Sequence, residues 1–204
     1  NDDNSQDAKW LKSILHPFTF RRYLDFTTLD ALRNMKKLIA TEIRRRRLSN
    51  NIKLGAGGIR EVEFFAQSFQ LIHGGREPAL QSKSLLRTLD ALTELDIVER
   101  DVTQQLKSDY LFLRKVEHTL QQAQDRQTQT LPELPWQQAA LIEVIGFDSY
   151  SEFLVHLDTV MARIHAHFNE LVEESHDTHS EEDQLFTACQ DAWRLALQED
   201  EFTE

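Results

Sequence analysis

The sequence predicts an all-α protein, an antiparallel helical bundle of about six to seven helices, and three observations support this. Glycine and proline together supply only ten of the 204 residues, six and four respectively, while helix-forming residues are abundant. Apolar residues recur at spacings of three and four in several long segments, which indicates helices with one buried face. The alternation of apolar and polar residues that is typical of a strand is absent.

The first elements follow in order along the chain. Residues 1–27 are expected to form an N-terminal connector from a preceding domain, with a compact aromatic and basic segment at residues 18–23. A helix is predicted from Thr28 to about Leu48, with one apolar face that includes Met35. A glycine-containing loop leads into the next helix from Ile59, and Gly74 is suited to cap that helix at its end.

Local signals mark the starts and ends of the later helices. Ser82 or Ser84 is expected to begin a leucine-rich helix, and Asp101 resembles the N-terminal cap of a long helix that follows. Pro135 fits the first turn of a short helix that Gly146 would end.

A clear apolar stripe predicts the last long helix of the bundle. Ser149 and Glu152 have the spacing of a capping box at its start. Its apolar positions are Phe153, Leu157, Val160, Ile164, Phe168 and Leu171. We expect the bundle domain to cover residues 28–173 and an acidic linker with a C-terminal helix to cover 174–204. Trp136 and the phenylalanines are expected in the core.

Composition limits the classes of function. A formal net charge of −11 argues against non-specific binding to nucleic acid or to a membrane surface. The single cysteine, Cys189, excludes an intramolecular disulfide and is expected in the core. The sequence has no apolar run long enough to span a bilayer and no signal peptide, so a cytoplasmic location is expected. The start at Asn1 suggests a fragment of a longer protein.

Basic residues gather in two places despite the overall acidity. Arg44, Arg45 and Arg46 belong to a run of four arginines at the predicted end of a helix. Such a run is either a solvated helix end, where cations also favour the dipole, or a docking surface for an acidic partner. Arg21 and Arg22 have the same two interpretations, with a neighbouring domain as the partner.

Five of the six glycines lie between Asn51 and Arg76. Residues 53–64 read Lys-Leu-Gly-Ala-Gly-Gly-Ile-Arg-Glu-Val-Glu-Phe. Glycines permit unusual backbone angles and close approach, and a helix N-terminus between two cations can bind an anion. The alternative is a shaped turn with basic flanks. The order of residues matches neither a P-loop nor a dinucleotide-binding fingerprint.

No metal centre and no catalytic residue are predicted within this chain. Glu61 and Glu63 are two apart on a helix, so their side chains diverge by roughly 200° and cannot easily share one ion. His165 and His167 diverge for the same reason.

Three blocks of sequence carry a resemblance to a known family. They are Asn-Ile-Lys through Phe at residues 51–64, Gly-Gly-Arg-Glu-Pro at 74–78, and Gln-Thr-Gln-Thr-Leu-Pro at 127–132. With them, the chain from about Phe18 to Leu171 resembles the bifunctional glutamine synthetase adenylyltransferase/adenylyl-removing enzymes. The form Gly-Ile-Arg-Glu-Val-Glu-Phe is more similar to the N-terminal, adenylyl-removing half than to the transferase half, which reads Gly-Ile-Thr-Asp-Ile-Glu-Phe.

This resemblance implies a function and partners. The adenylyl-removing half uses inorganic phosphate to split AMP from a tyrosine of glutamine synthetase, releasing ADP, and the other half attaches AMP from ATP. Both respond to the PII signalling protein and to glutamine. The acids that bind Mg²⁺ with ATP or ADP would lie in an upstream nucleotidyltransferase domain, so the chain alone is expected to bind no cofactor and to be inactive.

The resemblance also gives the glycine loop a role. Lys53, Arg60 and the loop amides of Gly55, Gly57 and Gly58 are expected to contact phosphate or the catalytic domain. Glu63, with Gln67, is expected to orient Arg60 or to meet the neighbouring domain. The structural alternative is that Arg60 and Glu63 form a surface pair on one helix.

Two other interpretations remain open. The bundle could be a regulatory or docking module that binds PII protein or links the two catalytic halves, or it could be the helical domain of a PII uridylyltransferase. A Lys53 loop that faces a catalytic cleft favours the enzymatic interpretation, and a loop buried as a turn favours the docking module.

Overall fold

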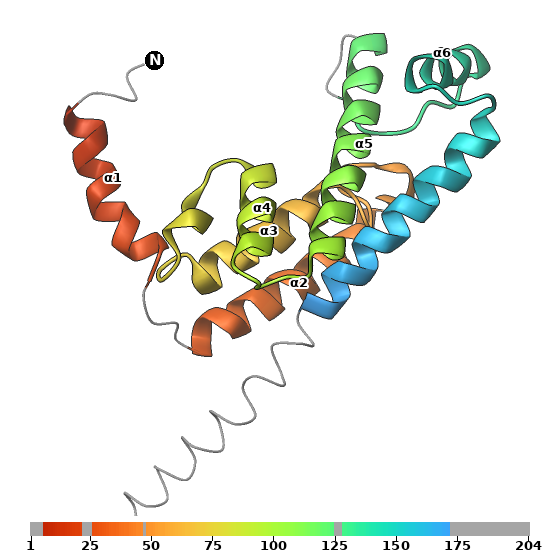
Figure 1. Cartoon of the computed structure of the whole chain (residues 1–204). Coiled ribbons are helices and arrows are strands. Elements are labelled where there is room, and N and C mark those ends of the chain that lie inside the picture. The colour runs from red at the N-terminus through yellow and green to blue at the C-terminus, as the bar shows by residue number, and fades with distance from the viewer. Residues whose placement is uncertain (1–5, 22–25, 47, 125–127, 172–204) are drawn as a thin grey trace, which may run out of the picture. The chain divides into compact units, whose positions relative to one another are not determined.

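Helices make up almost all of the regular structure. The computed structural model describes residues 6–21, 26–46, 48–124 and 128–171 (Figure 1). Its labelled helices are α1 (Gln6–Thr19), α2 (Phe26–Arg46), α3 (Ile59–His73), α4 (Leu85–Glu94), α5 (Arg100–Gln124) and α6 (Pro135–Ile145), with short 3-10 turns at Leu48–Asn50 and Pro78–Gln81. A further helix covers residues 150–171. The described residues contain no strand, which confirms the all-α prediction.

The chain divides into two compact units, Asn1–Phe168 and Asn169–Glu204. All the labelled helices belong to the first unit. Residues 172–204 lie outside the described residues, and with them the acidic linker and the helix containing Cys189 that the sequence predicts over 174–204.

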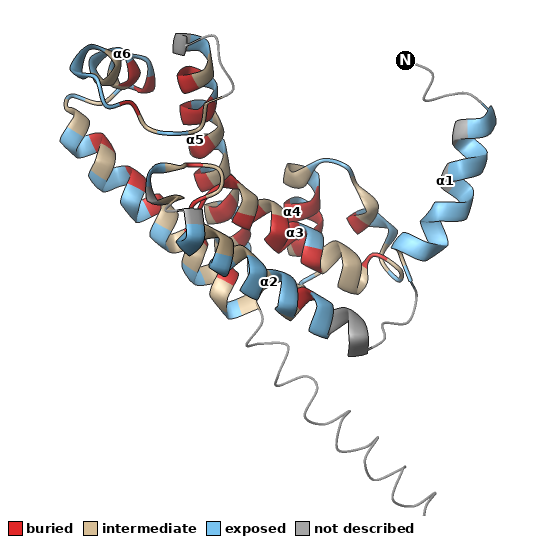
Figure 2. Cartoon of the chain, turned by 180° about the vertical axis from the view of Figure 1, so that it is seen from behind, coloured by how far each residue is buried: buried red, intermediate tan, exposed pale blue. Residues whose placement is uncertain are grey.

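The core lies between α3, α4, α5 and the helix over residues 150–171, whose buried residues face one another (Figure 2). Its fully buried side chains include Ile59, Leu89, Leu92, Leu106, Leu113, Phe153, Leu157 and Ile164. Burying one side chain of this size contributes roughly 1.5–3 kcal/mol. The apolar spacing predicted from the sequence is therefore confirmed for these four helices.

Two helices bury less than the sequence predicts. Met35 of α2 is 49% exposed and Trp136 of α6 is 64% exposed, so the expectation that Trp136 belongs to the core was wrong. α6 packs on α5, and Leu141 and Ile145 are its buried residues. Trp136 follows Pro135 in the first turn of α6, away from that contact face.

Most of the predicted helix ends are confirmed. The Ser84 hydroxyl accepts from the Arg87 amide, and the Ser149 hydroxyl accepts from the Glu152 amide at 3.1 Å. Gly146 ends α6 in the left-handed conformation, with φ of 94°. The prediction that Asp101 caps α5 was wrong. The helix begins at Arg100, and the Thr103 amide donates to the Glu99 carbonyl.

The segment expected as a connector contains a helix. α1 exposes a row of large apolar side chains, Trp10, Leu11, Ile14, Leu15 and Phe18. His16 Nε2 lies 2.7 Å from Gln81 Oε1. A Cβ added to Gly74 would lie 2.7 Å from the Phe20 ring, so this glycine permits a close approach.

We predict that Gly57→Ala destabilises the domain far more than Gly146→Ala. Both glycines have positive φ, but a Cβ at Gly57 would lie 1.8 Å from the Met161 carbonyl oxygen, whereas a Cβ at Gly146 would meet nothing within 4 Å. Backbone strain alone costs about 1–2 kcal/mol, which is the loss expected for Gly146→Ala. Overpacking adds roughly 1–3 kcal/mol for Gly57→Ala. Urea unfolding of the two variants measures the difference, and equal losses would contradict the close packing.

Candidate functional site

The glycine loop is a closed turn stabilised by its own backbone. The Asn51 side-chain oxygen accepts from the amides of Lys53 and Leu54, at 3.0 and 2.7 Å. The Gly55 amide donates to the Asn51 carbonyl, and the Gly58 amide donates to the Gly55 carbonyl. Gly55, Gly57 and Gly58 are buried.

The amides at the start of α3 are also used internally. Ile59 donates to the Ile52 carbonyl, Arg60 to the Lys53 carbonyl and Glu61 to the Gly58 carbonyl, each at 3.0–3.1 Å. The Gly57 amide donates to the Glu61 carboxylate. The glycines therefore shape the turn, and the side chains of Lys53 and Arg60 are the groups of this loop that can reach outward.

Two of the three sequence blocks meet in space. The Ile52 amide donates to the Gln129 carbonyl at 3.0 Å, and the Leu131 amide donates to the Asn50 carbonyl at 3.1 Å. A single antiparallel bridge joins Asn51 and Thr130. The segment over residues 128–131 thus pairs with the residues that lead into the glycine loop. The sequence does not predict this contact, because the two segments are far apart in the chain.

The second block, at residues 74–78, has a structural role. The Gln81 amide group donates to the Gly74 carbonyl at 2.6 Å. Gln70 of α3 donates to the carbonyls of Leu80 and Ser82, each at 2.7 Å. These bonds fix the turn that connects α3 to α4.

Glu61 lies at the centre of the loop. Its carboxylate is fully buried and accepts from the Gly57 amide at 2.9 Å. Nδ1 of His165, on the helix over residues 150–171, lies 2.9 Å from the same oxygen. The sequence predicts no partner for His165. Its position next to the apolar stripe residue Ile164 is the available signal, but the contact depends on tertiary packing.

Lys53 joins the loop to α5. Its ammonium lies 3.3 Å from Oε1 of Glu117, outside hydrogen-bond geometry, so this contact is electrostatic. Arg114, one turn earlier on α5, donates to the other oxygen of Glu117. Glu117 is only 1% exposed, which makes it the buried centre of a charged group that sequence reasoning missed.

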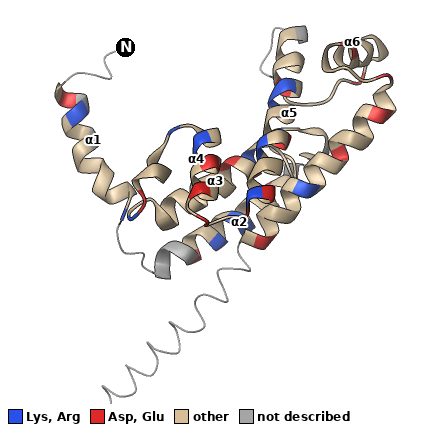
Figure 3. Ribbon diagram, viewed as in Figure 1, with Lys and Arg blue, Asp and Glu red and all other residues tan. Residues whose placement is uncertain are grey.

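Arg60 and Glu63, the other two charged residues predicted for the site, lie in the first turns of α3. The Arg60 guanidinium donates to the Leu54 carbonyl at 3.0 Å, while its Nε is buried and has no hydrogen-bond partner among the described residues. Glu63 is half-buried, and its negative charge acts on the phenol of Tyr110 on α5. Burial raises the pKa of Tyr110, Arg114 opposes that shift, and Glu63 and Glu117 add to it. Figure 3 shows charges of both signs along α5.

The arginines predicted to contact a neighbouring domain or partner lie after α1 and at the end of α2. Arg21 is exposed, with its guanidinium carbon 5.1 Å from the centre of the Phe18 ring, and Arg22 lies outside the described residues. Arg44 and Arg45 are exposed at the end of α2, and the side chain of Arg46 is not described. The hydrogen bond and charge of Glu42 raise the pKa of Arg45.

The described residues contain neither a candidate metal site nor a membrane-spanning helix. Among residues 6–171, apart from the short undescribed gaps, no three side chains converge in a way that could hold a metal ion. In the same part of the chain, no helix is long and apolar enough to cross a membrane.

We predict that Glu61→Ala strongly destabilises the chain, while Gln67→Ala, an exposed change on the same helix, does not. Removing the carboxylate leaves the buried Gly57 amide without its acceptor and His165 without its partner. An unsatisfied buried group costs about 1–3 kcal/mol and the lost charge partner adds to that. Chemical denaturation of both variants gives the comparison, and a Glu61 variant as stable as the Gln67 variant would refute the central role of Glu61.

Comparison with known proteins agrees with the resemblance seen in the sequence. Residues 33–172 match the model of the family described as GlnD PII-uridylyltransferase. Over all 204 residues the chain is 88% identical to the bifunctional glutamine synthetase adenylyltransferase/adenylyl-removing enzyme of Alteromonas mediterranea, and it spans 21% of the length of that relative. The chain therefore belongs to the GlnD PII-uridylyltransferase family, as a helical domain similar to a segment of the glutamine synthetase adenylyltransferases.

Proposed function

We propose that the chain is a helical accessory domain of an enzyme that reversibly adenylylates glutamine synthetase. The observation that carries this proposal is the 88% identity over the whole chain to an enzyme named for both adenylyl transfer and adenylyl removal. Because that match covers one fifth of the relative, the catalytic chemistry is assigned to the longer polypeptide, and the chain alone is inactive.

The domain belongs to the adenylyl-removing half. The supporting feature is the form Gly-Ile-Arg-Glu-Val-Glu-Phe at residues 58–64. In that reaction a phosphate oxygen bonds to the phosphorus of the AMP group, the bond from that phosphorus to the tyrosine oxygen breaks, and the tyrosine oxygen takes up a proton. ADP and unmodified glutamine synthetase are the products. The Mg²⁺ and the nucleotide belong to the upstream nucleotidyltransferase domain.

Within this enzyme, Lys53, Arg60 and Glu63 form the side of the domain that meets phosphate or the catalytic domain. The loop geometry supports a role for the side chains, because the amides of Gly55, Gly57 and Gly58 donate to acceptors inside the chain. Arg21 and the arginines at the end of α2 would contact a neighbouring domain or glutamine synthetase.

A docking module is the second candidate, and one observation favours it. The glycine loop is buried as a turn, which is the arrangement expected if the bundle links the catalytic halves or binds PII protein. The exposed apolar face of α1 would then be part of the contact surface.

We expect the double variant Lys53→Ala/Arg60→Ala, in the full-length enzyme, to release ADP from adenylylated glutamine synthetase and phosphate at least about tenfold more slowly. The loss of stability should be moderate, about 1–3 kcal/mol, because the part-buried Leu54 carbonyl loses the Arg60 donor and buried Glu117 loses the Lys53 contact, while Arg114 still neutralises Glu117.

Lys107→Ala is the matched control, because Lys107 pairs with Asp90 at the α4–α5 contact. This variant should release ADP at the unchanged rate. The 204-residue chain alone should release no ADP. Normal turnover by the double variant would favour the docking module, and release by the chain alone would place catalytic residues within it.

A further inference from the structure

Glu117 is a buried carboxylate shared by two cations from different parts of the chain. Lys53 comes from the glycine loop and Arg114 from α5, and each contacts a different oxygen of Glu117. A buried carboxylate is costly unless it is paired, so Glu117 holds both cations near it. Two charged side chains that would otherwise move independently are fixed side by side.

The two cations are partly exposed, unlike the carboxylate between them. The side chains of Lys53 and Arg114 are 34% and 33% exposed, while that of Glu117 is 1% exposed. An ammonium has three N–H donors and a guanidinium has five; the Lys53 contact with Glu117 is electrostatic, and Arg114 donates to Glu117 from Nη1. The carboxylate therefore lies behind the two cations, whose side chains reach solvent.

Arg60 adds a third cation. Its amide bonds to the Lys53 carbonyl, and its guanidinium is held by the Leu54 carbonyl while Nε has no acceptor. On α5 and α3, the charged groups that act on the Tyr110 phenol are Arg114, Glu63 and Glu117. The phenol of Tyr110 lies among them and supplies a neutral hydrogen-bond donor.

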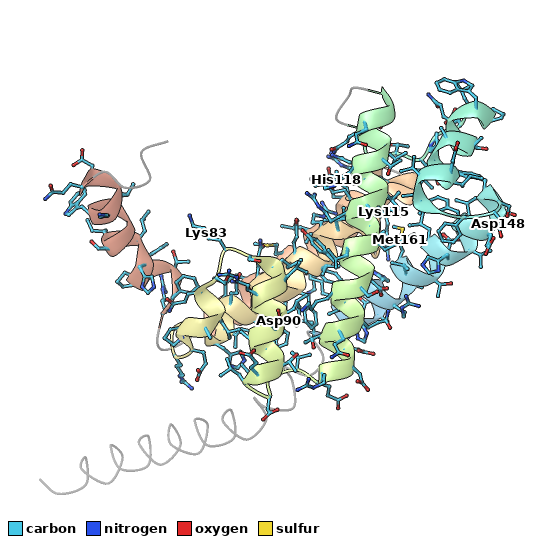
Figure 4. The ribbon with its side chains drawn as sticks, turned by 45° about the horizontal axis from the view of Figure 1, so that its top comes forward. Lys83, Asp90, Lys115, His118, Asp148 and Met161 are labelled. Carbon is cyan, nitrogen blue, oxygen red and sulfur yellow. The ribbon has the colours of Figure 1, made fainter. Side chains whose placement is uncertain are left out.

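We propose that Lys53, Arg60 and Arg114 form a binding site for a phosphate group, with Glu117 as the positioning residue that holds Lys53 and Arg114. A guanidinium beside an ammonium matches the oxygens of a phosphate, which accepts several charge-assisted hydrogen bonds at once. This inference rests on the proposed function for the source of the phosphate, either inorganic phosphate or the phosphate of ADP. Lys115, the next cation on α5, is engaged with the Ile145 carbonyl and is not part of the site (Figure 4).

The test is a titration of the 204-residue chain with inorganic phosphate, and separately with ADP, at constant ionic strength. Nuclear magnetic resonance of the arginine Nε–H groups reports on Arg60 and Arg114 directly. Both signals should shift and saturate with phosphate and stay unchanged with chloride. Saturation with inorganic phosphate alone identifies it as the ligand, and saturation with both shows that the site accepts the phosphate group of either source.

Variants separate positioning from simple charge. Arg114→Gln should weaken phosphate binding about tenfold, Arg114→Lys should weaken it less, and Lys115→Ala should leave it unchanged. Glu117→Gln removes a negative charge, so charge alone predicts tighter binding, whereas loss of positioning predicts weaker binding. A melting curve for each variant confirms that it is folded.

Three results would overturn the proposal: no saturable shift of Arg114, an equal response to chloride, or unchanged binding in folded Arg114→Gln. Tighter binding by Glu117→Gln would overturn the positioning role. Because the titration needs no glutamine synthetase, its failure is distinct from a failure of the proposed reaction. If the full-length enzyme releases ADP but the Arg114 variants bind phosphate normally, the phosphate site is contradicted and the proposed reaction is not.

Discussion

The arrangement of the domain depends on the contact between the glycine loop and the helix over residues 150–171. Gly57 lies so close to the backbone of Met161 that no side chain fits between them, and the Gly57 amide is held by the buried Glu61. His165, one turn beyond Met161 on the same helix, contacts the same carboxylate oxygen that the Gly57 amide bonds to. Packing and hydrogen bonding thus fix the start of α3 against a helix about a hundred residues away.

This contact also positions the glycine loop that contains Lys53. The segment over residues 128–131 pairs with the entrance of the loop, so Lys53 is placed over α5 by a backbone that is held on two sides. Arg114 belongs to the long helix α5, and Glu117 joins the two cations. Groups mounted on rigid elements keep their geometry better than groups on free loops, which suits a site for a small anion.

The two comparisons match this helical domain to enzymes with different names. The matching family model is described by a uridylyltransferase, whereas the relative with 88% identity is described by adenylyl transfer and removal. A shared fold does not select a reaction. In our proposal the side chains around Glu117, rather than the bundle itself, select the ligand.

The sequence by itself determined the helices, because apolar spacing, proline and glycine act over a few residues. It placed the starts of α3, α4 and α6, the end of α6 at Gly146 and the buried stripe from Phe153 to Phe168. Even local signals failed at Asp101, where the Glu99 carbonyl makes the first bond, and at Trp136, which packing on α5 leaves exposed. Only the tertiary structure paired Glu61 with His165 and Lys53 with Glu117, since these contacts join residues that are far apart in the chain and have no shared periodicity.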